Sequence, residues 1–343
     1  MNHARALASF VFAGCTALAL PVRAVAGTLT HVTFTATSPL SSNAELARRM
    51  LSPLKNAALA NLIAKGAKLA EQPVDPAKET FVLYVPSRAP AGGYGLVVFV
   101  PPWDVARLPD GWGPVLDQAG MIFVSAAKSG NDQNVLARRE PLALLGQTNV
   151  AQRYRLDPTR IYVAGFSGGS RVALRLALGY PDVFRGAILD AGSDAIGTAT
   201  IPLPPRDLLA RFQETSHIVY LTGDRDTAAV AADAASLHSL NDWCVFGVDE
   251  RSAMNEGHDA MGGTALAVAL DLLAKPAASD AAKLASCRTD IESAINAKLA
   301  SARALLASGK RDAARQLLLN IDAQYGGLAA PASVELAKAV GIP

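Results

Sequence analysis

The stretch TRIYVAGFSGGSRVALR, residues 159–175, contains the pattern that decides the fold class. Its β-branched apolar run ends in a tight turn, Gly165-Phe166-Ser167-Gly168-Gly169, which leads directly into a helical pattern. A serine at the tip of such a turn needs small neighbours, because the strained backbone packs closely against the strand and the helix. The glycines around Ser167 meet this need, so the strand-turn-helix context makes Ser167 a candidate nucleophile. The alternative is a glycine-rich turn that carries no chemistry.

Short apolar runs on both sides of this unit have the length and composition of buried strands. Most of them are continuous rather than alternating, which suits strands that are covered on both faces, and helical stretches separate the later ones. The sequence therefore predicts a mostly parallel sheet with helices on both faces, built from runs at 79–86, 94–101, 121–126, 160–166, 186–192, 217–223 and 244–248.

Helical patterns flank the predicted sheet. Residues 43–71 place apolar side chains at helical spacing, interrupted at Ser52-Pro53, which predicts two helices or one kinked helix. Two more helical patterns follow a Lys-Pro linker after Ala274 and meet at Gly309. The second resembles half of a tetratricopeptide-type hairpin, and a single unit of that kind has too little partner surface to stand alone. We expect it to pack against the sheet domain rather than to dock another protein.

The N-terminus has the features of a secretory signal peptide. Basic residues precede an apolar stretch from Ala6 to Leu20, and Ala24-Val25-Ala26 matches a signal peptidase site. The alternatives are a lipoprotein-type cleavage at Cys15 and an uncleaved anchor. The expected organisation is a signal peptide at 1–26, a helical segment at 27–78, a catalytic domain at 79–275 and a C-terminal helical extension at 276–343.

Removal of the signal peptide leaves two cysteines, Cys244 and Cys287, in a chain expected to be periplasmic or secreted. An even number of cysteines in an exported chain is compatible with a disulfide. Two buried free thiols are the other interpretation, because sequence alone gives no distance between them.

Composition excludes several classes of partner and cofactor. The chain has 343 residues, a formal net charge of +2 and no basic stripe, so nucleic acid and anionic lipid surfaces are poor candidates. No apolar stretch after the N-terminus is long enough to cross a membrane. No Cys/His cluster has metal-ligand spacing and no glycine-rich phosphate loop is present, so we expect neither a metal nor a cofactor. The oligomeric state is left open.

A serine nucleophile needs a base, and the base needs a carboxylate that fixes its tautomer. Among the five histidines, His258 alone lies in a polar loop that follows the last predicted strand and precedes a predicted helix. The other histidines are interpreted as solvated or structurally satisfied side chains. The acid is expected where the strand at 217–223 ends, which leaves a choice between Asp224 and Asp226.

The order Ser167, Asp226, His258 on alternating strands and helices resembles the α/β-hydrolase superfamily over roughly residues 79–275. The segment DPTRIYVAGFSGGSRVALRLALGYPDVFRGAI is similar to exported esterases of the polyhydroxybutyrate depolymerase and feruloyl esterase type. This resemblance implies an α/β-hydrolase fold, here with N- and C-terminal helical additions. It also implies Asp226 as the acid, through the G-x-x-D arrangement at 223–226, with Asp224 as a turn residue and Asp194 as a weaker candidate.

The oxyanion hole implied by this resemblance combines the backbone N–H of Gly168 with one from the loop after the strand at 94–101. The usual His-Gly pair of that loop is replaced by Pro101-Pro102, and proline has no N–H to donate. Trp103 aligns with the usual donor and retains its N–H. Its ring is either a packing aromatic or a wall of the pocket.

Polar loop residues after the strand at 121–126 are candidates for substrate contacts. Asn131 and Asp132 bind substrate hydroxyls in one interpretation and only form a turn in the other. The following Arg138-Arg139-Glu140 is interpreted as a solvated helix face rather than as a clamp for a carboxylate.

The sequence thus predicts an exported serine hydrolase that cleaves carboxylic esters through an acyl-enzyme, without a cofactor. A peptidase on the same fold and a non-catalytic binding or scaffold protein are the alternatives, and the unusual proline pair favours the latter. The connection at 193–216 is short and proline-rich, which predicts an open pocket without a large lid. A small-molecule ester or a polymer end would fit it, and the sequence does not choose between them.

Overall fold

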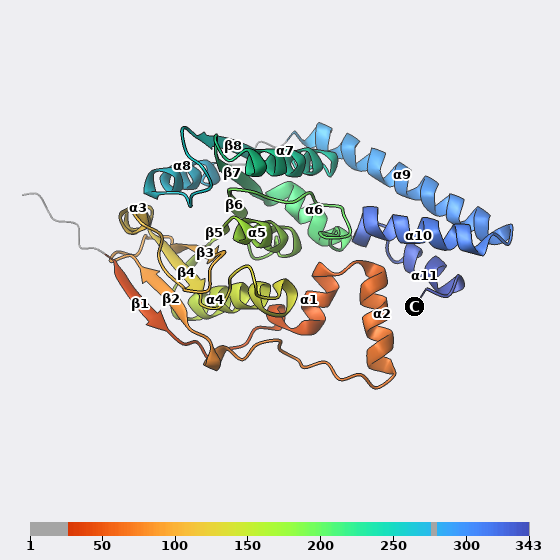
Figure 1. Cartoon of the computed structure of the whole chain (residues 1–343), viewed down its shortest axis with the longest axis horizontal. Coiled ribbons are helices and arrows are strands. Elements are labelled where there is room, and N and C mark those ends of the chain that lie inside the picture. Colours follow the sequence, from red (N-terminus) through yellow and green to blue (C-terminus); the bar gives the residue numbers. More distant parts are fainter. Residues whose placement is uncertain (1–26, 276–279, 343) are drawn as a thin grey trace, which may run out of the picture.

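One eight-stranded sheet forms the centre of the molecule (Figure 1). The structure is a computed structural model that describes residues 27–275 and 280–342. The strand order is β1-β2-β4-β3-β5-β6-β7-β8. The strands are β1 (Thr28–Val32), β2 (Phe81–Val85), β3 (Tyr94–Val100), β4 (Met121–Ala126), β5 (Leu156–Phe166), β6 (Gly186–Asp190), β7 (His217–Gly223) and β8 (Val248–Ala253).

The direction of the strands identifies the fold. β2 pairs antiparallel with β1 and with β4, and every other neighbouring pair is parallel. β3 and β4 exchange places relative to their order in the chain, and the carboxyl ends of the parallel strands meet at one edge of the sheet. This is the α/β-hydrolase fold, so the predicted fold class is confirmed.

Two apolar clusters show that helices cover both faces of the sheet. One face packs against α3 (Trp112–Ala119) and α8 (Gly263–Leu273), with Trp112, Leu116 and Leu266 in that cluster. The larger cluster lies on the opposite face. Its helices are α4 (Glu140–Arg153), α5 (Gly168–Gly179), α6 (Arg206–Thr215) and α7 (Thr227–Asp242).

The N-terminal helical pattern forms two helices, α1 (Asn43–Met50) and α2 (Pro53–Ala64). The break between them is fixed from a distant part of the chain, because the carboxylate of Asp322 accepts hydrogen bonds from the Ser52 hydroxyl and from the Leu54 N–H. Ser52-Pro53 therefore separates two helices, which is one of the two predicted outcomes.

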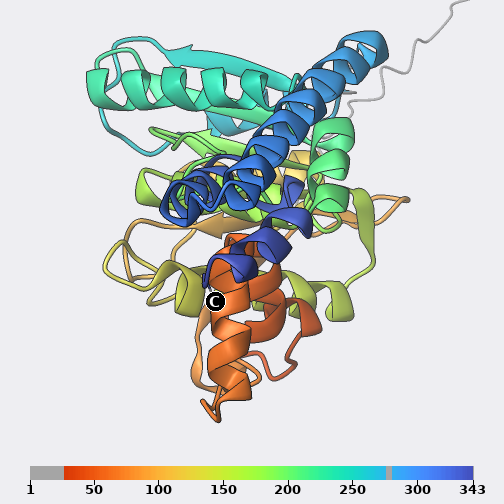
Figure 2. The same cartoon turned by 90° about the vertical axis from the view of Figure 1, so that its right-hand side faces the viewer.

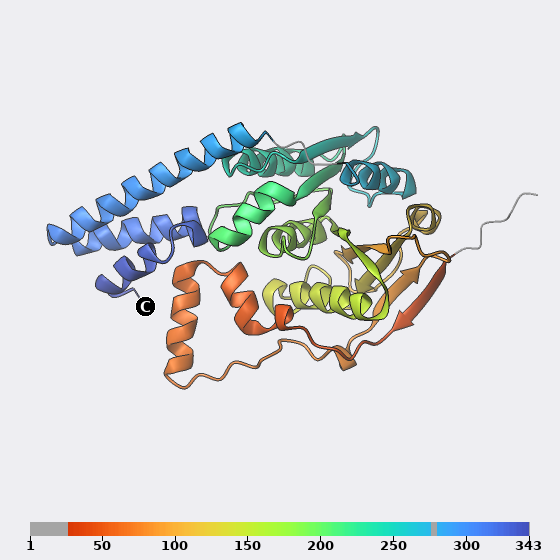
Figure 3. The same cartoon turned by 180° about the vertical axis from the view of Figure 1, so that it is seen from behind.

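The C-terminal residues form α9 (Ala281–Ala307), α10 (Arg311–Tyr325) and α11 (Ala332–Ala339). Their apolar side chains, including Leu299 and Leu318, belong to the same buried cluster as α4 to α7. α11 contacts α2 (Figure 2), and the whole extension lies at the end of the molecule away from β1 (Figure 3). The extension packs against the sheet domain, and α11 is a helix that the sequence pattern did not predict.

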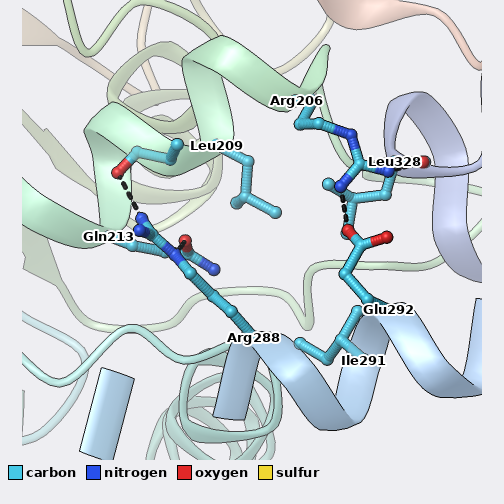
Figure 4. Close-up of a pocket in the computed structure, with 8 residues that line it drawn as sticks. Arg206, Leu209, Gln213, Arg288, Ile291, Glu292 and Leu328 are labelled. Carbon is cyan, nitrogen blue, oxygen red and sulfur yellow. Dashed lines mark hydrogen bonds and ion pairs between the residues drawn. The ribbon is translucent and has the colours of Figure 1, made fainter. Parts of the chain in front are cut away.

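Charged side chains join α9 to α6 around a cavity of about 280 Å³ (Figure 4). The Arg288 guanidinium contacts Glu214 at 2.8 Å and donates to the Gln213 side chain and the Ala210 carbonyl. Arg206 forms an ion pair with Glu292 of α9. These contacts hold the extension in place.

A disulfide adds a covalent link to this interface. Cys244 lies just before β8 and Cys287 lies on α9, and the two are joined in the structure with their Cα atoms 5.9 Å apart. The disulfide interpretation is therefore confirmed and the free-thiol alternative is wrong.

Replacing both Cys244 and Cys287 by serine is expected to destabilise the protein. The bridge closes a loop with a sequence separation of 43 residues, and a loop of that length corresponds to about 4 kcal/mol of lost chain entropy in the unfolded state. Chemical denaturation of the oxidised wild type, the reduced wild type and the double variant checks this. The reduced wild type and the variant should lose stability equally; full retention of stability by both would contradict the expectation.

The last predicted strand was placed wrongly. Residues 244–247 form a connection, and the strand itself, β8, begins at Val248 and continues through the polar sequence VDERSA. The edge strand β1 was not predicted at all. The predicted signal peptide, residues 1–26, lies outside the described residues. Within the described part of the chain, no helix is both long enough and apolar enough to span a membrane.

Candidate active site

Ser167 occupies a strained turn between β5 and α5. Its φ of 55° and ψ of −122° lie where side-chain-bearing residues are rare, and its N–H donates to the Asp190 carbonyl at 2.8 Å. A Cβ on Gly165 would overlap the backbone of Gly169, and a Cβ on Gly169 would overlap the Val100 carbonyl. These two close approaches explain why the turn requires glycine on both sides of the serine.

His258 lies against Ser167. Its Nε2 is 2.9 Å from the serine Oγ, and its Nδ1 is hydrogen-bonded to a carboxylate oxygen of Asp226. The imidazole is 51% exposed, whereas the Asp226 side chain is 8% exposed. The structure thus brings together the three residues that the sequence analysis selected, each at the carboxyl edge of the sheet.

The competing candidates lie elsewhere. Asp224 is exposed, and the hydrogen bonds of the His258 ring go to Asp226 and Ser167 instead. The Asp194 carboxylate pairs with Arg171 at 2.9 Å. Two of the other histidines have structural surroundings: His217 pairs with Asp249 at the start of β7, and His238 is on the surface of α7. Asp226 is therefore the carboxylate that the geometry offers to His258.

Asp226 also forms the N-cap of α7, where its Oδ1 accepts the Ala229 N–H at 3.1 Å. Burial disfavours its charged form, but the hydrogen bonds from His258 and Ala229 outweigh burial and hold the pKa of this carboxyl below its usual value. The carboxylate is consequently charged across the pH range in which an imidazole titrates.

Two backbone N–H groups near Ser167 have no acceptor among the residues that the structure describes. They belong to Gly168, the first residue of α5, and to Trp103. The carbonyls of Pro101 and Pro102, in turn, are both occupied: the first accepts from Arg139 at 2.9 Å and the second from the Asn131 N–H at 3.0 Å. The proline pair is thus anchored through its carbonyls, and this anchoring fixes the position of Trp103.

Aromatic rings line one side of the serine. Phe166 lies 5.0 Å from the His258 ring, and Trp103 lies 6.1 Å from Phe166. The guanidinium of Arg107 covers the Trp103 ring at 4.3 Å. The indole therefore packs beside the site, in agreement with both roles considered for its ring.

The interpretation of residues 138–140 as a solvated face is wrong. Arg139 is 3% exposed and Glu140 is fully buried. Arg139 donates to the carbonyls of Ser129 and Pro101, and Glu140 pairs with Arg175 of α5 at 2.6 Å. Local sequence contains no signal for this burial, because the Pro101 carbonyl and Arg175 come from distant segments of the chain.

Of the two loop residues expected to bind substrate, only Asn131 lies beside the serine. Its side chain covers Gly168 so closely that a Cβ there would overlap the amide oxygen. Asp132 is exposed and does not line the adjoining cleft, whereas Asn134 does.

A buried carboxyl clamps the segment that follows His258. Asp190, at the end of β6, accepts the Met261 N–H at 2.8 Å, and the Trp112 indole donates to the Met261 carbonyl at 3.0 Å. Burial raises the pKa of Asp190 to about 8, and the neighbouring Asp233 adds to the rise although the Met261 hydrogen bond opposes it.

This shift predicts that stability falls as pH rises. Between about pH 4 and 8 the unfolded chain has an ionised Asp190 and the folded protein a neutral one, so the folded state binds more protons and loses stability with increasing pH. Asp190→Asn keeps an acceptor for Met261 but cannot ionise. It should melt about 5 °C above the wild type at pH 8 and show a weaker pH dependence. Asp110→Asn changes an exposed aspartate and is the control, so its Tm should match that of the wild type at every pH. If Asp190→Asn instead lowered the Tm by the same amount at every pH, the carboxyl of Asp190 would be charged in the folded protein.

The arrangement supplies a nucleophile, a base, an orienting carboxylate and two N–H donors, which together suffice for acyl transfer. No group of three His, Cys, Asp or Glu side chains that could hold a metal ion occurs in the described ranges.

Comparison with known proteins gives only distant similarities. No protein-family model matches the chain, and no curated protein matches its sequence. Among solved structures, S-formylglutathione hydrolase (FrmB) from Staphylococcus aureus is similar at 12% identity and a TM-score of 0.45, over 57% of this chain and 93% of its own. A ferulic acid esterase has 12% identity and a TM-score of 0.47, over 73% and 98%. FphF, a fluorophosphonate-binding serine hydrolase from Staphylococcus aureus, has 10% identity and a TM-score of 0.48, over 73% and 100%.

Proposed function

We propose that this protein is a serine hydrolase that cleaves carboxylic esters through an acyl-enzyme. The observation that carries the proposal is the continuous contact from Ser167 Oγ to His258 Nε2, at 2.9 Å, and from His258 Nδ1 to the Asp226 carboxylate. A hydroxyl, an imidazole and a carboxylate in that order form the arrangement that activates a serine for attack on a carbonyl carbon.

In the proposed reaction, Ser167 Oγ attacks the ester carbonyl while His258 Nε2 takes the hydroxyl proton. The same nitrogen then returns this proton to the alcohol oxygen as the bond between the carbonyl carbon and that oxygen breaks. Water then gives a proton to His258 Nε2 as it attacks the carbonyl carbon of the acyl-enzyme. The imidazolium returns this proton to Ser167 Oγ as the bond between the acyl carbon and Oγ breaks, and the acid product leaves. Asp226 keeps the Nδ1 proton in place and stabilises the imidazolium.

The negative charge on the tetrahedral intermediate requires hydrogen-bond donors. The backbone N–H groups of Gly168 and Trp103 are available for this purpose, and the second is held in place by the anchored prolines. Loss of the usual His-Gly pair is therefore compatible with a working oxyanion hole. This argument favours the enzyme over a non-catalytic scaffold.

We further infer that the protein is exported. The signal-like sequence at 1–26 and the disulfide between Cys244 and Cys287 support this, because disulfides persist in oxidising compartments.

Short-chain esters are expected to be better substrates than long-chain esters. The connection between β6 and α6 contains no helix that could serve as a lid, and the cleft beside Gly168 is open and partly polar. A long alkyl chain would stay in water there and would add little to transition-state binding. The value of kcat/KM should be at least about tenfold higher for 4-nitrophenyl butyrate than for the palmitate ester. A preference for palmitate would indicate an apolar channel.

Two measurements on the purified mature protein test the proposed function. A fluorophosphonate probe should label the protein covalently, and short-chain esters should turn over faster than matched peptide amides. Faster amide cleavage would indicate a peptidase. Absence of both labelling and turnover would instead favour a binding or scaffold protein.

A further inference from the structure

A cleft with a volume of about 660 Å³ opens beside the proposed nucleophile. It lies between the 131–139 segment, α5 and the loop that follows β6. Its lining residues are Asn131, Asn134, Val135, Leu136, Arg139, Gly168, Arg171, Val172, Arg175, Asp194 and Thr200. Gly168, the residue after Ser167, connects the cleft directly to the reacting centre.

The charge of the cleft wall is mostly positive. Three arginines and one carboxylate, Asp194, line it. Arg171 and Arg175 follow Ser167 by four and eight residues, so one face of α5 presents them about 6 and 12 Å along the helix from the serine. The positive end of the α5 dipole adds to this field at the same point.

The three guanidinium groups differ in how they are neutralised. Arg175 is 11% exposed and pairs with the buried Glu140, and Arg139 donates only to carbonyl oxygens among the described residues. Arg171 is 45% exposed, and its partner Asp194 is 37% exposed. The Arg171–Asp194 pair is thus accessible to solvent, and a second carboxylate can approach Arg171 from the cleft.

The position of His258 decides which half of an ester would enter the cleft. Because this imidazole protonates the leaving alcohol in the proposed mechanism, the alcohol must lie on its side of Ser167. Neither the His258 loop nor Trp103 contributes to the cleft wall. The acyl group therefore extends across Gly168 into the cleft, where Val135, Leu136 and Val172 offer apolar contacts for its methylene groups.

We propose that the cleft binds acyl groups that end in a carboxylate, so that the preferred substrates are monoesters of dicarboxylic acids. The inference rests on the proposed function. A guanidinium recognises a carboxylate through two parallel hydrogen bonds, and Arg171 is the group placed to make them. The methylene chain between the two carboxyl carbons spans the apolar part of the wall.

The test compares two esters of the same chain length and leaving group, 4-nitrophenyl hydrogen glutarate and 4-nitrophenyl pentanoate. They differ only in that one acyl chain ends in a carboxylate and the other in a methyl group. In the wild type the ratio of their kcat/KM values should favour the glutarate, and added salt should reduce it. Arg171→Gln should lower the ratio about tenfold, since it removes a charged hydrogen-bond partner.

Two further variants sharpen the result. Asp194→Asn should raise the ratio severalfold, because it removes the carboxylate that competes for Arg171. Arg185→Gln is the matched control. This arginine precedes β6 at the opposite edge of the sheet from the site, and its side chain donates a long hydrogen bond, 3.4 Å, to the Pro158 carbonyl. It should leave the ratio at the wild-type value.

A wild-type ratio that favours pentanoate, or a ratio that Arg171→Gln and Asp194→Asn do not change, would overturn the inference and leave the proposed function intact. Failure of both esters to turn over would overturn the proposed function instead. In that case, binding of a carboxylate in the cleft is tested by thermal shift. Free glutarate should raise the Tm of the wild type more than that of Arg171→Gln. Equal shifts would overturn the inference in that case too.

Discussion

Ser167→Ala is expected to abolish ester hydrolysis and covalent labelling by a fluorophosphonate. Alanine cannot attack a carbonyl carbon, so the acyl-enzyme route is lost, and kcat should fall by about 10⁴-fold or more, to the level that oxyanion stabilisation and binding alone provide. The substitution removes one oxygen atom and leaves the packed glycines and the turn backbone unchanged. The melting temperature should therefore stay close to that of the wild type.

Ser170→Ala provides a matched control in α5, the helix that begins directly after Ser167. Ser170 lies three residues further along, is fully buried, and has a hydroxyl without a hydrogen-bond partner among the described residues. Its loss should leave labelling and turnover near the wild-type values. Intact protein mass spectrometry after treatment with the probe distinguishes the outcomes, and a mass increase that persists in Ser167→Ala would place the nucleophile at another serine.

The sequence predicted the central strands and the turn that carries Ser167 because both depend on local patterns. β5 and α5 follow from a β-branched run, a glycine turn and a helical pattern, and the loop that contains His258 follows from its position after the last strand, β8. Most of the parallel strands are buried on both faces and are therefore visible as apolar runs.

Edge strands lack that signal. No residue of β1 or β8 is fully buried, so these strands have few apolar side chains and are held mainly by backbone pairing with β2 and β7. The burial of Arg139 and Glu140 was not predicted for a similar reason, because no local sequence pattern indicates it. A charged residue is expected to be solvated unless its partners are known. Here the partners include the Pro101 carbonyl, which follows β3, and Arg175 on α5, which only the folded chain brings together with them.

The choice between Asp226 and Asp224 shows how structure adds to a sequence motif. Both follow β7 and both are aspartates, so residue type cannot separate them. The turn places Asp226 at the N-cap of α7 with one oxygen on the Ala229 N–H and the other on His258, whereas the side chain of Asp224 is exposed. The cap orients the carboxylate toward the imidazole.

Asp226→Asn is expected to reduce kcat by about 10⁴-fold while the protein remains folded. Asparagine is as good an N-cap as aspartate, so α7 keeps its hydrogen bond at Ala229 and the stability loss should be small. The catalytic loss has a different cause: an amide donates to the imidazole Nδ1, which moves the ring proton to Nε2 and blocks removal of the serine proton. Measurement of kcat and Tm on the same preparation separates the two effects.

Asp224→Asn is the control for this prediction, since it makes the same chemical change two residues away on an exposed side chain. Its kcat should stay within about threefold of the wild type, because it leaves the Asp226 hydrogen bond in place. The wild-type carboxylate, with its pKa held below the usual value, stays charged at neutral pH, so the large loss in Asp226→Asn should appear across the neutral range. A larger loss of kcat in Asp224→Asn than in Asp226→Asn would contradict this assignment. It would mean that Asp224 orients the imidazole during turnover and that the hydrogen bond between Asp226 and His258 does not.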